Sequence, residues 1–573
     1  MRAIATKDNL IKLFLGLVAL CTVIGSAYGL LLVHQWYFSS PALHKGAVVS
    51  NGAECAAIGR QIIQEGGSAA DSIISVLLCE GVVLPHAIGI GGGFIATIYN
   101  KEKGTFESLV AREMAPAASH PYMFVNISSL NGATTVAVPG ELKGYWELHQ
   151  KYGKLPWKRL FEPSIELCKK GVPVTNFMWI SMLENEKVIQ EEPTLRGVFS
   201  DPVTNKLKPK GSLIYRPALA KTLKIVSEQG SDAFYYGDVG KGLVRDLKAR
   251  GGIITEEDLA NYRVKWTEPT QVNLKGGYSV YSTPLPGGGA VLSLILNLMN
   301  ELITNEQNIF WHRLMESFKH AYGRRAQLGD LDIEPEVEEL FKNMTDPDFA
   351  DNVRETIYDN GVIHDMSHYG AQYTAAEDHG TAAMSVLHPN GDAISITSTI
   401  NDNFGSKIRS LSTGIILNDN MDDFSTPGVQ NYYGYPPTPL NFIKPGKRPL
   451  SSMSPSIIVD KNGDVRMIIG AAGGSKIPTS VAQVIIRYLY LDEPLYETVQ
   501  SPRLHHQLQP KLLKYEEGFD KEILNDLQRK GHILKELKSE EGFAALTAIG
   551  AKSETPEPVF DNRRGGSAVV VDV

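Results

Sequence analysis

The chain lacks the short motifs that mark several common enzyme classes. It has only four cysteines in 573 residues, and none of them forms a Cys-x-x-Cys pair. Neither a His-Glu-x-x-His nor a Gly-x-Ser-x-Gly motif occurs. The first two absences remove the usual signals of a zinc site. The third argues against a serine hydrolase of the α/β type. We therefore expect neither a metal nor another cofactor.

An excess of positive charge is also absent. Lys and Arg total 56 against 64 Asp and Glu, which gives a formal net charge of −8. Since no basic stretch is interleaved with aromatic residues, we expect no nucleic-acid partner. The chain has neither internal repeats nor low-complexity runs, and its length allows a large core over more than one typical domain.

One long uncharged run stands near the N-terminus, from Leu13 to Val33. About 20 apolar residues cross a bilayer as a helix, whereas the apolar region of a signal peptide has roughly 7–15. Arg2, Lys7 and Lys12 precede the run, so the positive-inside rule places the N-terminus in the cytosol. A cleaved signal peptide and a buried helix are the alternatives. We predict a single-pass type II plasma-membrane protein with a cytoplasmic tail (1–12), a transmembrane signal-anchor (13–33), a stalk (34–45) and an extracellular catalytic part.

Two Asn-x-Ser/Thr sequons, at Asn126 and Asn343, fit an extracytoplasmic chain. We predict glycosylation at both. Short sequons also arise by chance, so they support the topology without deciding it.

The stretch Asp378-His379-Gly380-Thr381 indicates a threonine that becomes an N-terminus. A threonine hydroxyl is a weak nucleophile unless a base removes its proton, and a threonine at a chain start carries that base as its own α-amine. The α-amine has an ordinary pKa of about 7.7–8.0, so much of it is neutral near neutral pH. Gly380 lets the preceding peptide bend toward the hydroxyl. The alternative is that Thr381 merely begins a strand.

A hairpin is expected to place a second threonine beside Thr381. An Asn-Gly turn signal at 390–391 separates two β-rich runs. If it is a two-residue loop, Thr399 faces Ala382. A slip of one residue in this register leaves Thr399 within reach of Thr381.

A second Asn-Gly turn signal, at 462–463, predicts another hairpin. Its expected register sets Ser451 opposite Gly474 and Ser452 opposite Gly473. Adjacent hydroxyls can bind a carboxylate, and adjacent glycines expose backbone N–H groups to an oxyanion. Taken singly, each pair is as well explained by a polar loop or a flexible strand end. Their meeting at the open end of one hairpin favours a binding site.

These residues resemble the γ-glutamyltransferase (glutathione hydrolase) family, and further motifs extend the resemblance from about Gly46 to the C-terminus in the family's order. The matching segments are Gly66-Gly67-Ser68-Ala69, Gly89-Ile90-Gly91-Gly92-Gly93, Ala111-Arg112-Glu113, Asp378-His379-Gly380-Thr381, Thr399-Ile400-Asn401, Phe404-Gly405-Ser406, Met421-Asp422-Asp423-Phe424, Lys444-Pro445-Gly446-Lys447, Pro449-Leu450-Ser451-Ser452-Met453 and Gly470-Ala471-Ala472-Gly473-Gly474.

The resemblance implies an α+β fold of the N-terminal-nucleophile hydrolase class, with two β-sheets between helical layers in a four-layer αββα sandwich. It implies a precursor that cleaves itself before Thr381 into a large subunit (46–380) and a small subunit (381–573). The new terminal threonine then attacks a γ-glutamyl amide and forms an acyl-enzyme. Water, or an amino-acid or dipeptide acceptor, takes the glutamyl group. Glutathione and its conjugates are the implied donors.

The resemblance also implies a role for each matching position. A glutamyl group carries a carboxylate and an ammonium on one carbon, and holding both fixes its γ-carbonyl against the nucleophile. Arginine suits the carboxylate and aspartate the ammonium. The implied assignments are Thr381 as nucleophile, Thr399 as the residue that orients it, the N–H groups of Gly473 and Gly474 as the oxyanion hole, Arg112, Ser451 and Ser452 on the α-carboxylate, and Asn401 and Asp423 on the α-ammonium.

The chain departs from the family's pattern at the ammonium site and at the pocket mouth. Relatives usually carry Glu or Gln two residues before the Asp-Asp pair, where this chain has Asn420. We expect Asn420 to contact the donor and to bind it less tightly than a Glu. Asp402 and Asn403 stand where some animal relatives have an aromatic residue that shields the pocket.

Animal relatives also imply a disulfide between Cys55 and Cys79, which flank a helix-like segment. The second, closely spaced disulfide of the relatives has no counterpart here. Cys168 is expected to be a buried apolar residue.

Apolar spacing predicts helices over Leu142–Tyr152 and Ile309–Tyr322, and a further helix within Glu516–Lys538. The charged, weakly periodic stretch Asp330–His379 is interpreted as a mobile connector or an acidic solvated loop. His379, His505 and His506 are weighed as catalytic bases and set aside, because the threonine amine already supplies the base.

Two rival functions remain open at this point. One is a relative that acts on a different γ-glutamyl or acyl-amide donor. The other is an uncleaved, inactive surface protein that serves an interaction.

Overall fold

The computed structural model describes residues 45–373, 380–428, 436–538 and 542–572, together with 12, 14, 18–22 and 25–26. The predicted membrane span, 13–33, lies mostly outside the described residues, as do Asp378 and His379. Among the residues that are described, no helix is long and apolar enough to cross a bilayer. The chain divides into two units, 1–43 and 44–573, and the second unit carries the fold described here.

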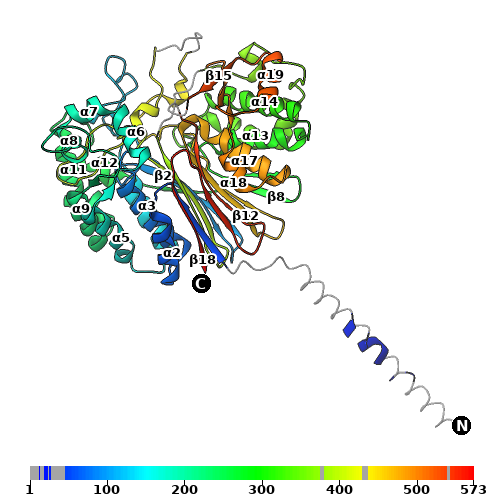
Figure 1. Ribbon diagram of the computed structural model, residues 1–573, viewed down its shortest axis with the longest axis horizontal. Helices are drawn as coiled ribbons and strands as arrows, with labels where there is room; N and C mark the ends of the chain where they lie inside the picture. Colours follow the sequence, from blue (N-terminus) through cyan, green and yellow to red (C-terminus); the bar gives the residue numbers. More distant parts are fainter. Residues whose placement is uncertain are drawn as a thin grey trace. The chain divides into compact units, whose positions relative to one another are not determined.

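Two β-sheets form the centre of the second unit (Figure 1). The larger sheet runs in the order β18 (Ser567–Asp572), β1 (Lys45–Ser50), β9 (Ala382–Leu387), β10 (Ala393–Thr399), β2 (Gly93–Asn100), β3 (Thr105–Ala111) and β6 (Lys265–Thr267). The smaller sheet runs in the order β17 (Glu557–Phe560), β16 (Ala545–Gly550), β12 (Val465–Ala472), β11 (Ser456–Val459), β8 (Tyr278–Ser282) and β7 (Thr270–Leu274).

Small and hydroxyl-bearing side chains lie between the two sheets. Ser395 Oγ donates to the carbonyl of Ile469 at 3.2 Å, and Thr97 Oγ1 donates to the carbonyl of Pro455 at 2.8 Å. A Cβ on Gly470 would come within 3.3 Å of the Cβ of Ala383. The sheets therefore approach closely, and buried hydroxyls find partners across the gap, as buried polar groups require.

Helices cover the outer face of each sheet (Figure 1). Each sheet and its helices enclose an apolar core of their own. The predicted mixture of helix and sheet, with helical layers on both sides, agrees with this arrangement. On the larger sheet lie α2 (Cys55–Gln64), α3 (Ala69–Val83) and α4 (Glu141–Tyr152), backed by α5 (Trp157–Lys170) and α9 (Pro217–Gln229). On the smaller sheet lie α13 (Gly289–Leu302), α17 (Ile477–Tyr490) and α18 (Leu495–Gln500), and α14 (Gln307–Arg325) packs on α13.

Shorter elements complete the described chain. They are β4 (Val172–Pro173), α6 (Asn176–Glu184), α7 (Glu186–Glu191), α8 (Pro193–Phe199), β5 (Leu213–Ile214), α10 (Asp232–Tyr235), α11 (Asp238–Lys248), α12 (Glu256–Asn261), α15 (Glu338–Thr345), α16 (Pro347–Arg354), β13 (Leu504–His505), β14 (Leu513–Glu516), α19 (Lys521–Arg529) and β15 (Leu534–Leu537), with 3-10 turns η1 (Ala133–Thr135), η2 (Pro335–Val337), η3 (Met366–Tyr369), η4 (Asn420–Asp423), η5 (Pro439–Asn441) and η6 (Gly474–Lys476).

The three predicted helices are confirmed as α4, α14 and α19. The interpretation of Asp330–His379 as a mobile connector or solvated loop is wrong for residues 338–354. Helices α15 and α16 form there and pack on α13. Their few apolar residues, among them Met344 and Val353, share a buried face, which weak periodicity in the sequence concealed.

The two hairpins differ from their expected registers in different ways. Strand β10 pairs with β9 so that Ser398 lies opposite Ala382, one residue from the expected register. The N–H of His388 donates to the carbonyl of Asp392, and the N–H of Gly391 donates to the carbonyl of His388. His388 and Asp392 are therefore paired, and the loop between them is longer than two residues. Continuing this register places Thr399 opposite Thr381.

The second hairpin keeps the expected register over Ser456–Ile458 and shifts by one near its turn. Its ladder ends at Ser456, however, so Ser451 and Ser452 do not pair with the glycines as strand partners. The N–H of Ser451 instead donates to the carbonyl of Pro286 at 2.8 Å. The two serines therefore precede the start of β11 and lie outside its ladder.

The disulfide between Cys55 and Cys79 is confirmed, with their Cα atoms 5.6 Å apart. The two cysteines do not flank one helix, because Cys55 begins α2 and Cys79 lies within α3. Cys168 is buried and unpaired, as expected.

Candidate active site

Thr381 stands directly before β9, and its hydroxyl lies beside that of Thr399 at the end of β10. Thr381 Oγ1 donates to Thr399 Oγ1 at 3.2 Å. Thr399 Oγ1 also accepts the N–H of Asn401 at 2.8 Å. Both threonines are buried. The backbone donor fixes the Thr399 hydroxyl, which in turn orients the hydroxyl of Thr381.

The backbone around Thr381 is strained. Gly380, Thr381 and Asn401 have φ values of 65°, 92° and 72°. For a β-branched residue a positive φ is rare, and such outliers cost on the order of 1–3 kcal/mol. A Cβ on Gly380 would come 1.6 Å from the carbonyl oxygen of Asn401. Only glycine fits at position 380, and the strain is stored next to the bond expected to break.

Arg112 and Asp423, expected to bind opposite charges of the donor, form a buried ion pair. Arg112 is 1% exposed and also donates to Glu113 Oε2 at 3.2 Å. Burial raises the pKa of Glu113 to about 7, so Asp423 is the main counter-charge of Arg112. The side-chain amide of Asn420 donates to Asp423 Oδ2 at 3.0 Å. Arg112, Asp423 and Asn420 thus converge on one point.

The buried polar atoms that have no hydrogen-bond partner among the described residues include Asn420 Oδ1 and Ser452 Oγ. Buried polar atoms are nearly always hydrogen-bonded, so both are candidates to contact a ligand. Arg112 Nε donates to the carbonyl of Pro449 at 3.4 Å, which brings the segment before Ser452 to the same ion pair. The amide of Asn401 donates to the carbonyl of Asp419 at 3.4 Å and so links the threonine pair to this region.

Gly473 and Gly380 line one cavity of about 600 Å³. Small-molecule sites typically measure about 300–1,000 Å³. Gly473 and Gly474 follow β12 with φ values of 140° and 59° and lead into η6 and α17. Backbone N–H groups at such a helix start suit an oxyanion. Asp402 and Asn403, which replace an aromatic residue of some relatives, line the same cavity.

Arg564 also lines this cavity, and the sequence patterns did not identify it as a site residue. Arg564 Nη1 lies 3.0 Å from the carbonyl oxygen of Thr381 and 3.5 Å from that of Gly380. No motif distinguishes Arg564 in the sequence, and the Arg-Arg pair at 563–564 was the only available signal.

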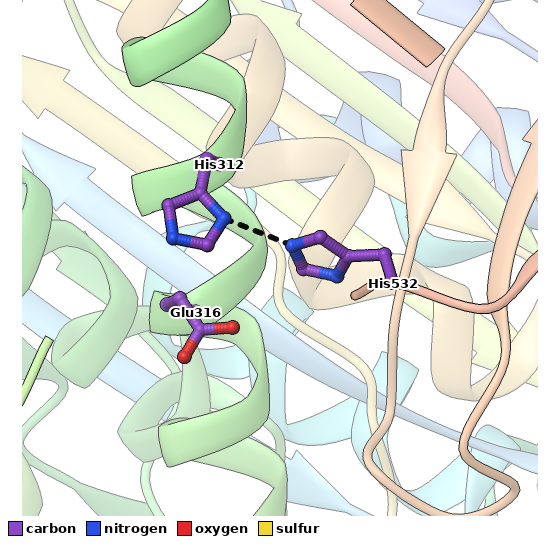
Figure 2. Close-up of side chains that lie close together, drawn as sticks. All are labelled: His312, Glu316 and His532. Atoms are coloured by element: carbon purple, nitrogen blue, oxygen red, sulfur yellow. Dashed lines mark hydrogen bonds between the residues drawn. The ribbon is translucent and has the colours of Figure 1, made fainter. Parts of the chain in front are cut away.

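A second cluster of buried titratable residues lies away from the threonine pair. His312 and Glu316 stand one helical turn apart on α14, and His312 Nδ1 meets His532 Nε2 at 3.0 Å (Figure 2). These three residues have a metal-like arrangement. Both carboxylate oxygens of Glu316 are nevertheless engaged, by Lys319 at 2.6 Å and by Tyr369 at 2.8 Å. The ammonium of Lys319 already neutralises the carboxylate, so the cluster is a structural hydrogen-bond network.

The histidines weighed as bases lie elsewhere. His379 is outside the described residues. His505 Nδ1 bonds Thr479 Oγ1 at 2.8 Å, and burial lowers the pKa of His505 to about 3. Burial likewise lowers the pKa of His506 well below its ordinary value. Neither has the pKa of a good base near neutral pH.

We expect Gly380→Ala to slow cleavage at position 381 at least tenfold, because the added Cβ overlaps the carbonyl of Asn401. The measurement is the fraction of cleaved chain against time on a denaturing gel. Gly104→Ala is the matched control, since Gly104 has φ 63° with open space around its Cα. Equal cleavage rates in the two variants would contradict the steric explanation.

We also expect buried His86 to make the fold acid-sensitive. Its ring packs against Phe177, and neither ring nitrogen has a hydrogen-bond partner among the described residues. Burial lowers its pKa from 6.5 to about 3. Below pH 6.5 the unfolded chain takes up a proton that the folded chain refuses, so stability is full above pH 6.5 and falls toward pH 3.

The measurement is the free energy of unfolding in urea at pH 7 and pH 4.5. His86→Leu should lose less between the two pH values than the unaltered protein, whereas exposed His120→Gln should behave as the unaltered protein. An equal loss in His86→Leu and the unaltered protein would show that His86 is not the sensitive group.

Comparison with known proteins agrees with this geometry. A family model described as Gamma-glutamyltranspeptidase matches residues 55–571. Scoloptoxin SSD14 of Scolopendra dehaani is 42% identical over 536 residues, which cover 91% of this chain and 92% of that protein. Glutathione hydrolase 3 of Arabidopsis thaliana is 36% identical over 508 residues, 86% of this chain and 79% of its own.

Among solved structures, the gamma-glutamyltranspeptidase of Helicobacter pylori has a TM-score of 0.51 and 29% identity, covering 54% of this chain and 90% of that chain. The family model and both relatives span most of the sequence, and the threonine pair and the Arg112–Asp423 pair lie within the matched range. The chain belongs to the gamma-glutamyltranspeptidase family.

Proposed function

We propose that this protein is a γ-glutamyl hydrolase/transferase that acts on glutathione and its conjugates and becomes active by cleaving itself before Thr381. The observation that carries the proposal is the hydroxyl of Thr381 bonded to that of Thr399 beside a glycine-lined cavity. The names of its relatives support the class of activity and the donor.

Self-cleavage begins when Thr381 Oγ1 attacks the carbonyl carbon of Gly380. The Oγ1–C bond forms, the C–N bond breaks, and the hydroxyl proton passes to the departing nitrogen. Water then hydrolyses the ester. The products are a large chain ending at Gly380 and a small chain beginning at Thr381, whose new α-amine is the base that the nucleophile lacked. The N-terminal-nucleophile hydrolase class follows from this chemistry.

Turnover uses the same hydroxyl. The α-amine of Thr381 takes its proton, the hydroxyl oxygen attacks the γ-carbonyl of the donor, and the amine of the leaving peptide receives a proton. The N–H groups of Gly473 and Gly474 stabilise the oxyanion. The acyl-enzyme is then cleaved. The reaction is hydrolysis when water takes the glutamyl group, and transfer when an amino-acid or dipeptide acceptor takes it.

The donor is held by its two charges. Its α-carboxylate lies against Arg112 with the hydroxyls of Ser451 and Ser452. Its α-ammonium lies against Asp423 and Asn420 Oδ1, assisted by Asn401. Arg112 and Asp423 neutralise each other before the donor arrives. Each charge of the donor therefore meets a protein charge that is already in contact with a partner of the opposite sign. A donor that lacks the ammonium loses the attraction of the Asp423 carboxylate and binds less well.

We expect the protein to consist of two chains, with the small chain starting at Thr381, and Thr381→Ala to remain one inactive chain. Denaturing gels and N-terminal sequencing of the small chain measure this. Thr381→Ser is the matched control and should still cleave, because it keeps the hydroxyl. A different small-chain terminus would overturn the mechanism.

A second experiment compares the rate at which the leaving group is released from glutathione with the rate for a glutaryl amide that lacks the α-ammonium. Faster release from glutathione supports the proposal. Equal rates would favour a relative acting on another acyl-amide donor, and an intact single chain without activity would favour a surface protein used for interaction.

We further propose that residues 13–33 anchor the protein in the plasma membrane as a type II signal-anchor, with Asn126 and Asn343 glycosylated outside. The uncharged run and the basic residues before it support this topology. Protease added to intact cells should remove the catalytic part and spare an N-terminal tag. A tag digested with the rest, or a secreted protein that begins after the run, would contradict the anchor.

A further inference from the structure

Arg564 is placed at the bond that is expected to break. Its Nη1 lies 3.5 Å from the oxygen of Gly380, the carbonyl that the Thr381 hydroxyl attacks, and 3.0 Å from the oxygen of Thr381. None of the roles assigned above to Thr381, Thr399 or the two glycines includes this arginine.

The neighbouring arginine fixes the turn from which Arg564 projects. Arg563 donates to Glu516, Asp561 and the carbonyl of Ser501 at distances between 2.5 and 3.0 Å. This holds the backbone between β17 and β18 against the rest of the fold. The side chain of Arg563 therefore holds this turn in place, while the side chain of Arg564 reaches the carbonyl oxygens of Gly380 and Thr381.

The guanidinium of Arg564 is also held on its far side. It stacks on the ring of Phe177 in α6, with its central carbon 4.8 Å from the ring centroid. A guanidinium held by an aromatic face loses little freedom when its N–H groups donate. Burial lowers the pKa of Arg564 to about 10, so it still carries its charge at neutral pH. Its positive charge in a partly desolvated cavity acts more strongly than it would in water.

We propose that Arg564 is a catalytic residue of the self-cleavage step, where it stabilises the negative charge that develops on the Gly380 oxygen. The proposal rests on the function proposed above. When Thr381 Oγ1 bonds to the Gly380 carbon, the carbonyl π electrons move to the oxygen and the carbon becomes tetrahedral. The contact at 3.5 Å shortens as the charge grows. When the C–N bond breaks, the electrons on the oxygen reform the carbonyl, and the negative charge on that oxygen disappears.

This role separates cleavage from turnover. After cleavage the Gly380 carbonyl belongs to another chain end, while Arg564 keeps its contact with the Thr381 carbonyl. The donor's oxyanion is assigned to Gly473 and Gly474 instead. Loss of Arg564 should therefore slow the formation of the two chains far more than it slows the reaction of the finished enzyme.

The experiment is pulse–chase labelling of the full chain, with the half-time of conversion from one chain to two read from gels. Loss of an oxyanion donor costs about 10²–10³ in rate when the contact is short, so we expect Arg564→Ala to lengthen the half-time at least tenfold. Arg564→Lys should recover part of the rate, because it restores the charge without the fork. Exposed Lys538 lines the same cavity, and Lys538→Ala should cleave as the unaltered protein does.

Once cleavage is complete, glutathione turnover per cleaved Arg564→Ala molecule should fall by a smaller factor than the cleavage rate does, since only the first reaction uses the Gly380 carbonyl. Cleavage of Arg564→Ala at the normal rate would overturn the proposal. So would an equal fall in cleavage and turnover that lysine does not rescue, because that pattern marks a structural role.

Two further results keep the interpretations apart. If Arg564→Ala does not fold, Arg564→Gln and Arg564→Lys carry the test, and slower cleavage with glutamine than with lysine supports the role of charge. Equal rates in those two variants would overturn it. If the unaltered protein stays one chain, or if Thr381→Ala cleaves at the same bond, the proposed function itself fails, whatever Arg564 does.

Discussion

The pairing register of β9 and β10 is the constraint on which the site depends. It sets Thr399 opposite Thr381, so the two hydroxyls meet at 3.2 Å. In the register expected from the sequence, with Thr399 opposite Ala382, one of the two hydroxyls would turn to the other face of the sheet, because a strand alternates its faces with each residue. The register is held by burial along both strands and by hydroxyl bonds to the neighbouring sheet. The second sheet is therefore part of what aims the nucleophile.

The ion pair of Arg112 and Asp423 is the second fixed point. A buried charge without a partner is costly, and this pair satisfies both members before any donor is bound. Under the proposed function, the pair also sets the orientation of the donor, because the carboxylate and ammonium on one carbon can match the pair in only one direction.

The sequence was informative where the residues act through local pattern. The turn signals, the glycine before Thr381, the helices α4 and α14 and the pairing of Cys55 with Cys79 could all be anticipated from residue type, spacing or family resemblance. Contacts that depend on distant parts of the chain could not be. The burial of α15 and α16 against α13 follows from tertiary packing that a weak periodicity does not reveal. Arg564 is 183 residues from Thr381, and the pairing of β18 with β1 at the edge of the larger sheet, together with the contacts of Arg563, brings this part of the chain back to the site.

Under the proposed self-cleavage, the positive φ of Thr381 also disfavours the rejoining of the two chains. The angle φ of a residue exists only while a peptide bond precedes it, so cutting the bond before Thr381 abolishes the strained torsion altogether. Strain on the order of 1–3 kcal/mol lowers the equilibrium constant for rejoining the two ends by roughly 5- to 150-fold. The left-handed conformation of a β-branched threonine is thus costly in the single chain, and the proposed cleavage removes that cost.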